Sequence, residues 1–241
     1  RMADCAARAA LAPAGALRVG INTANYLLVS QKQPAGQEGV APSLARELGK
    51  QLGVEVELVP FENPAAVASA IGEGRVDVGF LGADPKRAET ISFTEPYVDI
   101  PATYLVRADA PHKSVAEVDR AGVRVASMAG AAFDFWLDRH LRHAEVVRSA
   151  TMDGALDLFK TGKADVLASL RDRLLTDVSQ VPGAVVLEGH FMVVQQAVGL
   201  SRTRGRAAEE FLAGFVGGAK SSGLVASLLA QHGVQDRLFV S

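Results

Sequence analysis

The residue types that most often carry metal or covalent chemistry are sparse in this sequence. His140 and His143 have i, i+3 spacing on an expected helix, which permits a pair of metal ligands, but no third ligand is indicated and the segment is charged enough to be a solvated face. Cys5 is the single cysteine and lies in an N-terminal stretch that we expect to be frayed, and no serine lies in a Gly-x-Ser-x-Gly elbow. We therefore predict no metal site, no catalytic nucleophile and no cofactor.

The turn at residues 85–88 holds the side chain with the clearest binding chemistry, Arg87. A guanidinium presents a planar fork of N–H donors that matches a carboxylate, and it stays charged in a site without water. One alternative is open, in which Arg87 is a surface arginine beside Lys86 and Glu89 that is hydrogen-bonded to water. The other alternative is that Arg87 binds a carboxylate, which such a group is suited to do.

The first half of the chain alternates strand and helix patterns, and these elements must position the turn. Apolar runs predict strands, leucines at steps of four before Gly53 predict a helix, and Asn63 followed by Pro64 is typical of a helix start. The order strand, helix, strand, helix, strand implies parallel strands joined by right-handed crossovers. The expected elements are, in order, Leu17–Ile21, Val40–Leu52, Val54–Val59, Pro64–Glu73 and Val76–Leu81.

The same pattern returns in the second half, and two helical segments follow that must pack on one of the halves. We expect an α/β fold of two βαβ-type lobes, formed by residues 1–105 with 196–241 and by residues 106–195, with hinges at 104–106 and 193–195. Parallel sheets bind ligands beyond the carboxyl ends of their strands, so two such lobes predict a central cleft. The expected strands are 123–126, 145–147 and 164–168, and the expected helices are 132–141, 152–160, 206–217 and 224–231.

Several motifs, in order along the chain, are similar to those of a known family. The clearest are Arg75–Phe80, Pro85–Ala88 and Ile91–Tyr97, supported by Leu17–Ile21, Gly39–Gly53, Gly122–Val125 with Gly130, and Gly162–Asp165. Together they resemble the bacterial extracellular solute-binding proteins of family 3, over nearly the whole chain. The resemblance implies the type II periplasmic binding protein fold and the function of a receptor for an ABC importer of polar amino acids.

The resemblance implies that the first lobe anchors the α-carboxylate of the solute. The family has an arginine before its Phe-Ser/Thr-x-Pro-Tyr segment that pairs with this carboxylate, and Arg87 matches it. The family's loop before the arginine usually carries Ser or Thr donors, but Leu81–Asp84 has no hydroxyl. We expect the backbone N–H groups of Gly82 and Ala83 to serve instead.

The opposite wall of the site is expected at Asn22, Asn25 and Tyr26, at the end of the first strand. The family places an aromatic ring and polar groups there, against the side chain of the solute. An equal alternative is that Asn22 and Asn25 are turn residues that bond their own backbone.

The second lobe departs from the family where it receives the carboxylate. The family places threonines after a glycine, so that hydroxyls and the amides of a helix N-terminus hold the anion. Here Ala131 and Ala132 follow Gly130, so the amides remain and the hydroxyls do not.

The second lobe also departs where the family pairs an aspartate with the solute's ammonium group. Leu170 matches that position and Arg171 follows it. A buried ammonium without a carboxylate partner is strongly unfavourable. We therefore expect a carboxylate-bearing solute that is not an ordinary α-amino acid, unless Asp172 takes the role through a two-residue shift.

Some proteins of this fold are enzymes, dehydratases of cyclohexadienyl acids among them. Glu95, Asp84 and Asp99 are acids that such an enzyme could recruit, but no paired acid and base is visible. We expect a binding protein, with a lyase-type enzyme on the same scaffold as the alternative.

Composition restricts the partners. The 241 residues are 49% hydrophobic and carry a formal net charge of -2, so a nucleic-acid partner is not expected. No run approaches the ~18 apolar residues of a membrane span. The sequence predicts a monomeric solute receptor that contacts the membrane subunits of an ABC importer, in the periplasm although the cytoplasm is not excluded, with no signal peptide in this chain.

Overall fold

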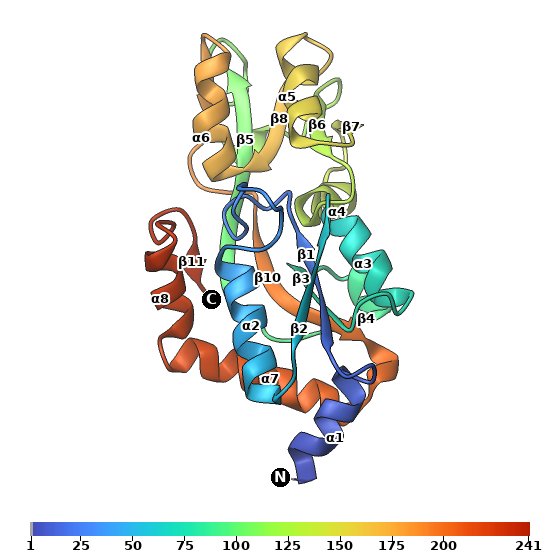
Figure 1. Cartoon of the computed structure of the whole chain (residues 1–241). Coiled ribbons are helices and arrows are strands. Elements are labelled where there is room, and N and C mark those ends of the chain that lie inside the picture. Colours follow the sequence, from blue (N-terminus) through green and yellow to red (C-terminus); the bar gives the residue numbers. More distant parts are fainter. Residues whose placement is uncertain (1) are drawn as a thin grey trace. The chain divides into compact units, whose positions relative to one another are not determined.

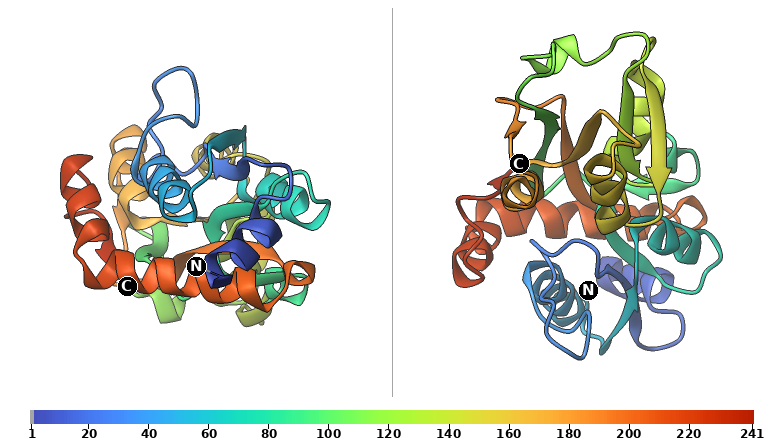
Figure 2. Two further views of the ribbon diagram at one scale, coloured as in Figure 1. Left: turned by 60° about the horizontal axis from the view of Figure 1, so that its bottom comes forward. Right: turned by 90° about the horizontal axis from the view of Figure 1, so that it is seen from above.

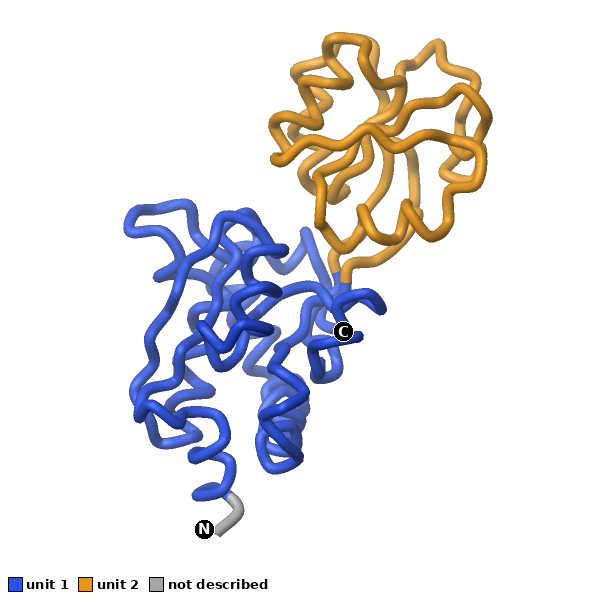
Figure 3. The backbone as a smooth tube through the Cα atoms, turned by 90° about the vertical axis from the view of Figure 1, so that its right-hand side faces the viewer, with its two compact units in different colours: residues 1–99, 195–241 blue, residues 100–194 orange. Residues whose placement is uncertain are grey.

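The structure, a computed structural model, describes residues 2–241, with side chains described from residue 4 onward. It consists of two compact units, residues 1–99 with 195–241 (unit 1) and residues 100–194 (unit 2) (Figure 3). Arg1, with which the expected first lobe begins, lies outside the described residues. The unit boundaries and the expected lobe boundaries fall in the same two strands, β5 (Val98–Arg107) and β10 (Met192–Ser201).

Unit 1 is an α/β unit whose sheet runs in the order β2, β1, β3, β10. β1 is parallel to β2 and β3, which confirms the predicted parallel strands, and β10 is antiparallel to β3 and β4. Its elements are α1 (Met2–Leu11), β1 (Leu17–Asn22), α2 (Val40–Leu52), β2 (Val56–Phe61), α3 (Pro64–Gly72), β3 (Val78–Gly82), the 3-10 turn η1 (Arg87–Glu89), β4 (Ile91–Phe93), the 3-10 turn η4 (Arg202–Arg204), α7 (Arg206–Ser221), α8 (Leu224–Gln231) and β11 (Phe239–Val240) (Figure 1).

Local sequence explains where two helices of unit 1 start and stop. α2 buries Leu44 and Leu48, and Gly53 ends it with a φ of 76°, a left-handed conformation that glycine adopts without strain. α3 starts at Pro64 and is capped by Asn63, whose side chain accepts a hydrogen bond from the Ala66 N–H at 2.8 Å. The predicted helix stop and helix start are both confirmed.

Unit 2 is a second α/β unit, with its sheet in the order β5, β8, β6, β7 and with β9 paired to β5. β6 is parallel to β7 and β8, as predicted, and β5 is antiparallel to β8. Its further elements are the 3-10 turn η2 (Val115–Glu117), β6 (Arg124–Met128), α4 (Ala132–His140), β7 (Glu145–Ser149), α5 (Met152–Lys160), β8 (Val166–Leu170), α6 (Arg171–Asp177), the 3-10 turn η3 (Val178–Gln180) and β9 (Ala184–Val186).

The expected frayed N-terminus is wrong for the part that the structure describes. Residues Met2–Leu11 form α1, which lies along α7 (Figure 2) and buries Ala7 and Leu11. Cys5 is exposed on this helix. Alanines form helices well, and burial against a neighbouring helix adds the stability that a short helix lacks by itself.

Two C-terminal helices pack in unit 1. α8 has its predicted bounds, and α7 continues four residues beyond its predicted end at 217. Within residues 2–241 there is no single helix with the length and apolar character of a membrane span, although α7 and α8, which meet at a 65° bend, satisfy those criteria as a pair.

Candidate functional site

Arg87 is the buried cation of the loop that follows β3. The residue is 6% exposed, and its Nη1 donates a hydrogen bond to the Gly82 carbonyl oxygen at 2.7 Å. Its neighbours Lys86 and Glu89 are exposed. The alternative of a surface arginine hydrogen-bonded to water is therefore wrong.

Burial makes the positive charge of Arg87 unfavourable. Loss of water lowers the pKa of the guanidinium from its usual value to about 10, and the negative charge of Asp84 opposes that shift. The group is still protonated at neutral pH. A carboxylate placed beside it would replace the lost hydration, which is the electrostatic requirement for binding an anionic solute.

Asp84 is the second buried charge of this loop, at 4% exposure. Its Oδ2 accepts a hydrogen bond from the Lys86 N–H at 2.8 Å, and its carbonyl oxygen accepts one from the Ala88 N–H at 2.8 Å. An aspartate that bonds the backbone two residues ahead forms an Asx turn. The turn holds both Asp84 and the start of η1 in place.

Two backbone groups of the loop that follows β3 already form hydrogen bonds within the chain. The Ala83 N–H donates to the Gln195 carbonyl oxygen at 2.8 Å, and the Gly82 carbonyl accepts from Arg87. Gly82 lies opposite Gln196 of β10, which is 6% exposed. To donate a hydrogen bond to a solute, the Ala83 N–H would have to break its hydrogen bond to the Gln195 carbonyl oxygen.

The expected wall at Asn22 and Asn25 forms a turn. Asn22 Oδ1 accepts a hydrogen bond from the Ala24 N–H at 3.0 Å, and Asn25 Oδ1 accepts one from the Leu28 N–H at 3.3 Å. These bonds support the turn interpretation. They involve the side-chain oxygens of both asparagines and not the side-chain nitrogens. Tyr26 is half-buried with the Arg237 guanidinium 5.8 Å from its ring centroid.

In unit 2, Gly130 precedes the first turn of α4 with a φ of 78°. Its N–H donates to Asp134 Oδ2 at 3.1 Å, and Asp134 is paired with Arg148 Nε at 3.0 Å. Ala131 is the N-cap residue and Ala132 begins the helix, with no side-chain cap. The Gly130 amide is thus engaged with a carboxylate of the chain itself.

The end of β8 passes directly into a helix. Leu170 is buried, and Arg171 is exposed as the first residue of α6. The half-buried Asp172 lies in the first turn of that helix. Unit 2 therefore presents an apolar side chain at the position expected to match an ammonium partner.

The other acids considered for catalysis are held by separate contacts. Glu95 is exposed with Lys220 Nζ at 3.8 Å, and Asp99 Oδ1 accepts a hydrogen bond from Ser241 Oγ at 2.5 Å. Neither contact pairs an acid with a base suited to proton transfer.

The histidine pair shows no metal geometry. His140 is stacked on Trp136, with ring centroids 4.2 Å apart, and its Nδ1 lies 2.9 Å from the Trp136 carbonyl oxygen. Across the described part of the chain, no cluster of three or more His, Cys, Asp or Glu side chains could hold a metal ion.

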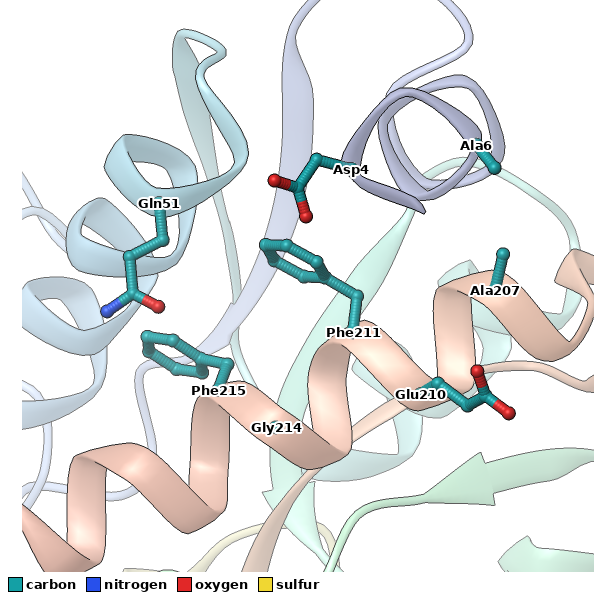
Figure 4. Close-up of a pocket in the computed structure, with 8 residues that line it drawn as sticks. All are labelled: Asp4, Ala6, Gln51, Ala207, Glu210, Phe211, Gly214 and Phe215. Carbon is teal, nitrogen blue, oxygen red and sulfur yellow. The ribbon is translucent and has the colours of Figure 1, made fainter. Parts of the chain in front are cut away.

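A surface hollow of about 370 Å³ lies between α1, α2 and α7 (Figure 4). The rings of Phe211 and Phe215 line it, with Asp4, Gln51 and Glu210 at its rim. Glu210 is ion-paired with Arg206 in solvent. Arg87, in contrast, is a buried charge.

Sequence reasoning missed the environment of Asp84 and considered it only as a catalytic acid. Its position directly before Pro85 and three residues before Arg87 was a signal for a turn with paired charges. The partnership of Asp134 with Arg148 was missed because the two residues lie 14 positions apart on different elements.

A family model described as bacterial extracellular solute-binding proteins, family 3, matches residues 17–180. No protein of curated function matches the chain in sequence. Among solved structures, a mutant of ArgBP from T. maritima is similar, with 21% identity and a TM-score of 0.75 over 95% of this chain and 100% of that chain.

Two further structures have a similar fold. The substrate-binding protein AbpA of an amino acid ABC transporter from Streptococcus pneumoniae, bound to L-arginine, is 20% identical with a TM-score of 0.74, over 92% of this chain and 96% of that chain. A histidine kinase sensor domain with similarity to periplasmic binding proteins is 18% identical with a TM-score of 0.76, over 94% and 98%. The fold is that of the type II periplasmic binding proteins, as predicted.

Proposed function

The chain belongs to the bacterial extracellular solute-binding proteins of family 3, and we propose that it is the receptor of an ABC-type importer for a solute whose carboxylate binds Arg87. The buried guanidinium of Arg87 is the observation that carries this proposal. A desolvated cation with a planar set of donors has its best partner in a carboxylate.

We also propose a class of solute, a membrane partner and a compartment for this protein. ArgBP and AbpA, which share the fold, are named for arginine and amino acid transport, and this supports an amino-acid-like or organic acid solute. Membrane subunits of the importer would be the protein partners, and the periplasm the compartment. The protein would act as a monomer and release its solute chemically unchanged.

A ligand screen tests the proposal. Thermal unfolding is measured with amino acids, dicarboxylates and aromatic acids, because a ligand that binds the native state raises its stability as RT ln(1 + [L]/Kd). We expect at least one carboxylate to stabilise the protein, and Arg87→Ala to weaken its binding about 100-fold or more. Arg87→Lys should recover only part of the affinity, because an ammonium lacks the bidentate fork.

Arg75→Ala is the matched control, because Arg75 is an exposed arginine of the same unit, ion-paired with Glu73 in solvent and 5.8 Å from the centroid of the Phe61 ring. It should leave the affinity unchanged. Circular dichroism checks that each variant is folded. An affinity that stays within about twofold of the wild type in a folded Arg87→Ala variant contradicts the role of Arg87.

A further inference from the structure

Gln196 is a buried polar residue at the end of the unit 1 sheet where ligands of α/β folds bind. In the antiparallel pairing of β10 with β3, Gln196 lies opposite Gly82, the last residue of β3, and Val198 lies opposite Phe80. Opposite residues of such a pair share one face of the sheet. Val198 and Phe80 are buried apolar residues, and Gln196 is the next residue on their face. The face therefore changes from apolar to polar at the carboxyl end of β3, where parallel sheets bind ligands.

The side-chain amide of Gln196 has no partner within the described part of the chain. Its backbone carbonyl accepts the Tyr97 N–H at 2.8 Å, but its side chain forms no hydrogen bond with another described residue. Both amide atoms are accessible to water, because neither is among the fully enclosed unpaired polar atoms of the described residues. With 6% of the residue exposed, this amide has lost most of its hydration without gaining a protein partner, which is unfavourable. Packing alone does not explain a glutamine at this position.

The pairing of the two strands places Gln196 beside the candidate carboxylate anchor. Gly82, directly opposite, accepts the hydrogen bond from Arg87 Nη1 at 2.7 Å through its carbonyl oxygen. Opposite Cα atoms in antiparallel strands are about 4.5–5.5 Å apart, and glycine has no side chain to separate Gln196 from the loop. A small solute whose carboxylate lies against Arg87 can therefore reach the Gln196 amide with a second group.

We propose that the Gln196 amide binds a hydroxyl or carbonyl group of the solute, so that the site selects hydroxy- or oxo-carboxylic acids. This inference rests on the proposed carboxylate-binding function and names the class of solute. An amide supplies N–H donors and a carbonyl acceptor, so it can bind either group. It carries no charge, so it does not compensate a second ionised group, whose burial needs an opposite charge. The class agrees with the sequence-based prediction that the solute is not an ordinary α-amino acid.

Matched pairs of acids test the inference. Affinities of the whole chain are measured by calorimetry for L-malate beside succinate, 2-oxoglutarate beside glutarate and phenyllactate beside phenylpropanoate. A site that hydrogen-bonds an oxygen of the solute rejects the analogue that lacks it, because a polar group of the protein then stays unpaired. The wild type should bind at least one oxygenated acid about 10- to 100-fold more tightly than its analogue.

Gln196→Met removes the amide and keeps a side chain of similar length. The variant should reduce the preference to about twofold or less, chiefly by weakening the binding of the oxygenated acid. In the ligand-free protein it should leave the urea midpoint of unfolding unchanged or raise it, because no hydrogen bond within the protein is lost. A purely structural glutamine would give a lower midpoint, so this measurement separates recognition from folding.

Gln195→Met is the matched control, because this neighbouring glutamine of β10 has an exposed side chain. The hydrogen bond from the Ala83 N–H to the Gln195 carbonyl oxygen involves the backbone and not that side chain. The control should keep the preference of the wild type. Gln196→Asn, which keeps a shorter amide, should retain more of the preference than Gln196→Met.

The outcomes also separate the two proposals. If Gln196→Met keeps the preference, or if no oxygenated acid binds more tightly than its analogue, the inference about Gln196 is overturned. A fall of both affinities together with a lower urea midpoint assigns Gln196 to the structure of the sheet and also overturns it. In each case the carboxylate-binding function stands if a carboxylate binds to the wild type and not to Arg87→Ala. If no carboxylate binds in this Arg87-dependent manner, the proposed function itself is wrong.

Discussion

Units 1 and 2 contain the same arginine–aspartate clamp in two different environments. In each, an arginine at the start of a central strand faces an aspartate that precedes the parallel neighbouring strand. Arg18 and Asp77 form the clamp of unit 1, on β1 and before β3, and Arg124 and Asp165 form that of unit 2, on β6 and before β8. Because the motif is the same in both units, a difference in the stability that the two clamps contribute comes from the residues around them.

The local geometry of the two clamps is nearly identical. Asp77 Oδ2 accepts the Arg18 N–H at 2.8 Å and Asp165 Oδ2 accepts the Arg124 N–H at 2.9 Å. In both, Nε of the arginine donates to the same Oδ2 at 3.2 Å. The backbone also matches, because the N–H of each aspartate donates to the carbonyl of its arginine.

The surroundings of the two aspartates differ in burial, and Asp77 has an additional arginine partner. The Asp77 side chain is 0% exposed, and Arg204 Nη1 lies 2.8 Å from its Oδ1. Arg204 also donates to the Ala10 carbonyl oxygen at 3.1 Å, which connects the clamp to α1. The Asp165 side chain is 40% exposed. The same motif is thus a buried, three-member charge group in unit 1 and a solvated pair in unit 2, so local sequence alone does not determine its energetic importance.

Removal of the two aspartates is the strongest test of this difference. Asp77→Ala leaves Arg18 and Arg204 without their shared anion, and loss of one member of a buried ion group costs about 3–5 kcal/mol of unfolding free energy. Asp165→Ala is the matched variant and should cost about 1 kcal/mol or less, because exposed pairs contribute little. Chemical denaturation followed by circular dichroism measures both, and equal losses would contradict the comparison.

Removal of the third partner should make the buried clamp more like the exposed one. Arg204→Met keeps much of the apolar side-chain stem but loses the charge and the bond to Ala10, for an expected loss of about 1–3 kcal/mol. Amide hydrogen exchange in α1 should become faster, because that helix loses its link to the sheet. Arg206→Met, at an arginine whose side chain is 89% exposed, is the control. An unchanged amide exchange rate in α1 would show that Arg204 does not stabilise this helix.

The smallest expected effect is the pH dependence of the exposed clamp. The hydrogen bond from Arg124 lowers the pKa of Asp165 below its usual value, and burial opposes this only in part. A lowered folded-state pKa means that the stabilisation is complete above the unfolded value of about 3.9 and is lost as the pH falls through the folded value. The difference in unfolding free energy between wild type and Asp165→Asn should therefore shrink as the pH falls from about 5 to about 3. A difference that does not change with pH contradicts this role of Asp165.

Hydrophobic periodicity predicted most of the fold. The α5 bounds, the α8 bounds, and the stop of α2 at Gly53 agree with the sequence-based expectation, because apolar spacing and terminal residues act within a few positions. α6 was missed, because among its seven residues only Leu174 and Asp177 are buried and no apolar period is visible. Its position depends on packing beside β8 and β9 in unit 2.

The candidate site was predicted in part. Arg87 was found because its position before the Phe93–Tyr97 segment matches the motif of the family, which is local information. The burial of Arg87 and Asp84, the bond from Ala83 to Gln195 and the pairing of Asp134 with Arg148 involve segments that meet only in the folded chain. No spacing rule reports those contacts.

The sequence by itself determined the alternation of strands and helices, the family, and which loop carries the candidate anchor, because these follow from residue types over short distances. The tertiary structure decided how much water each charge keeps. Arg204 reaches Asp77 and the backbone of Ala10, 194 residues before it, whereas the ion pair of Asp165 in the described part of the chain is with Arg124. Desolvation sets the strength of an ionic contact, and it depends on every segment that packs around the charge.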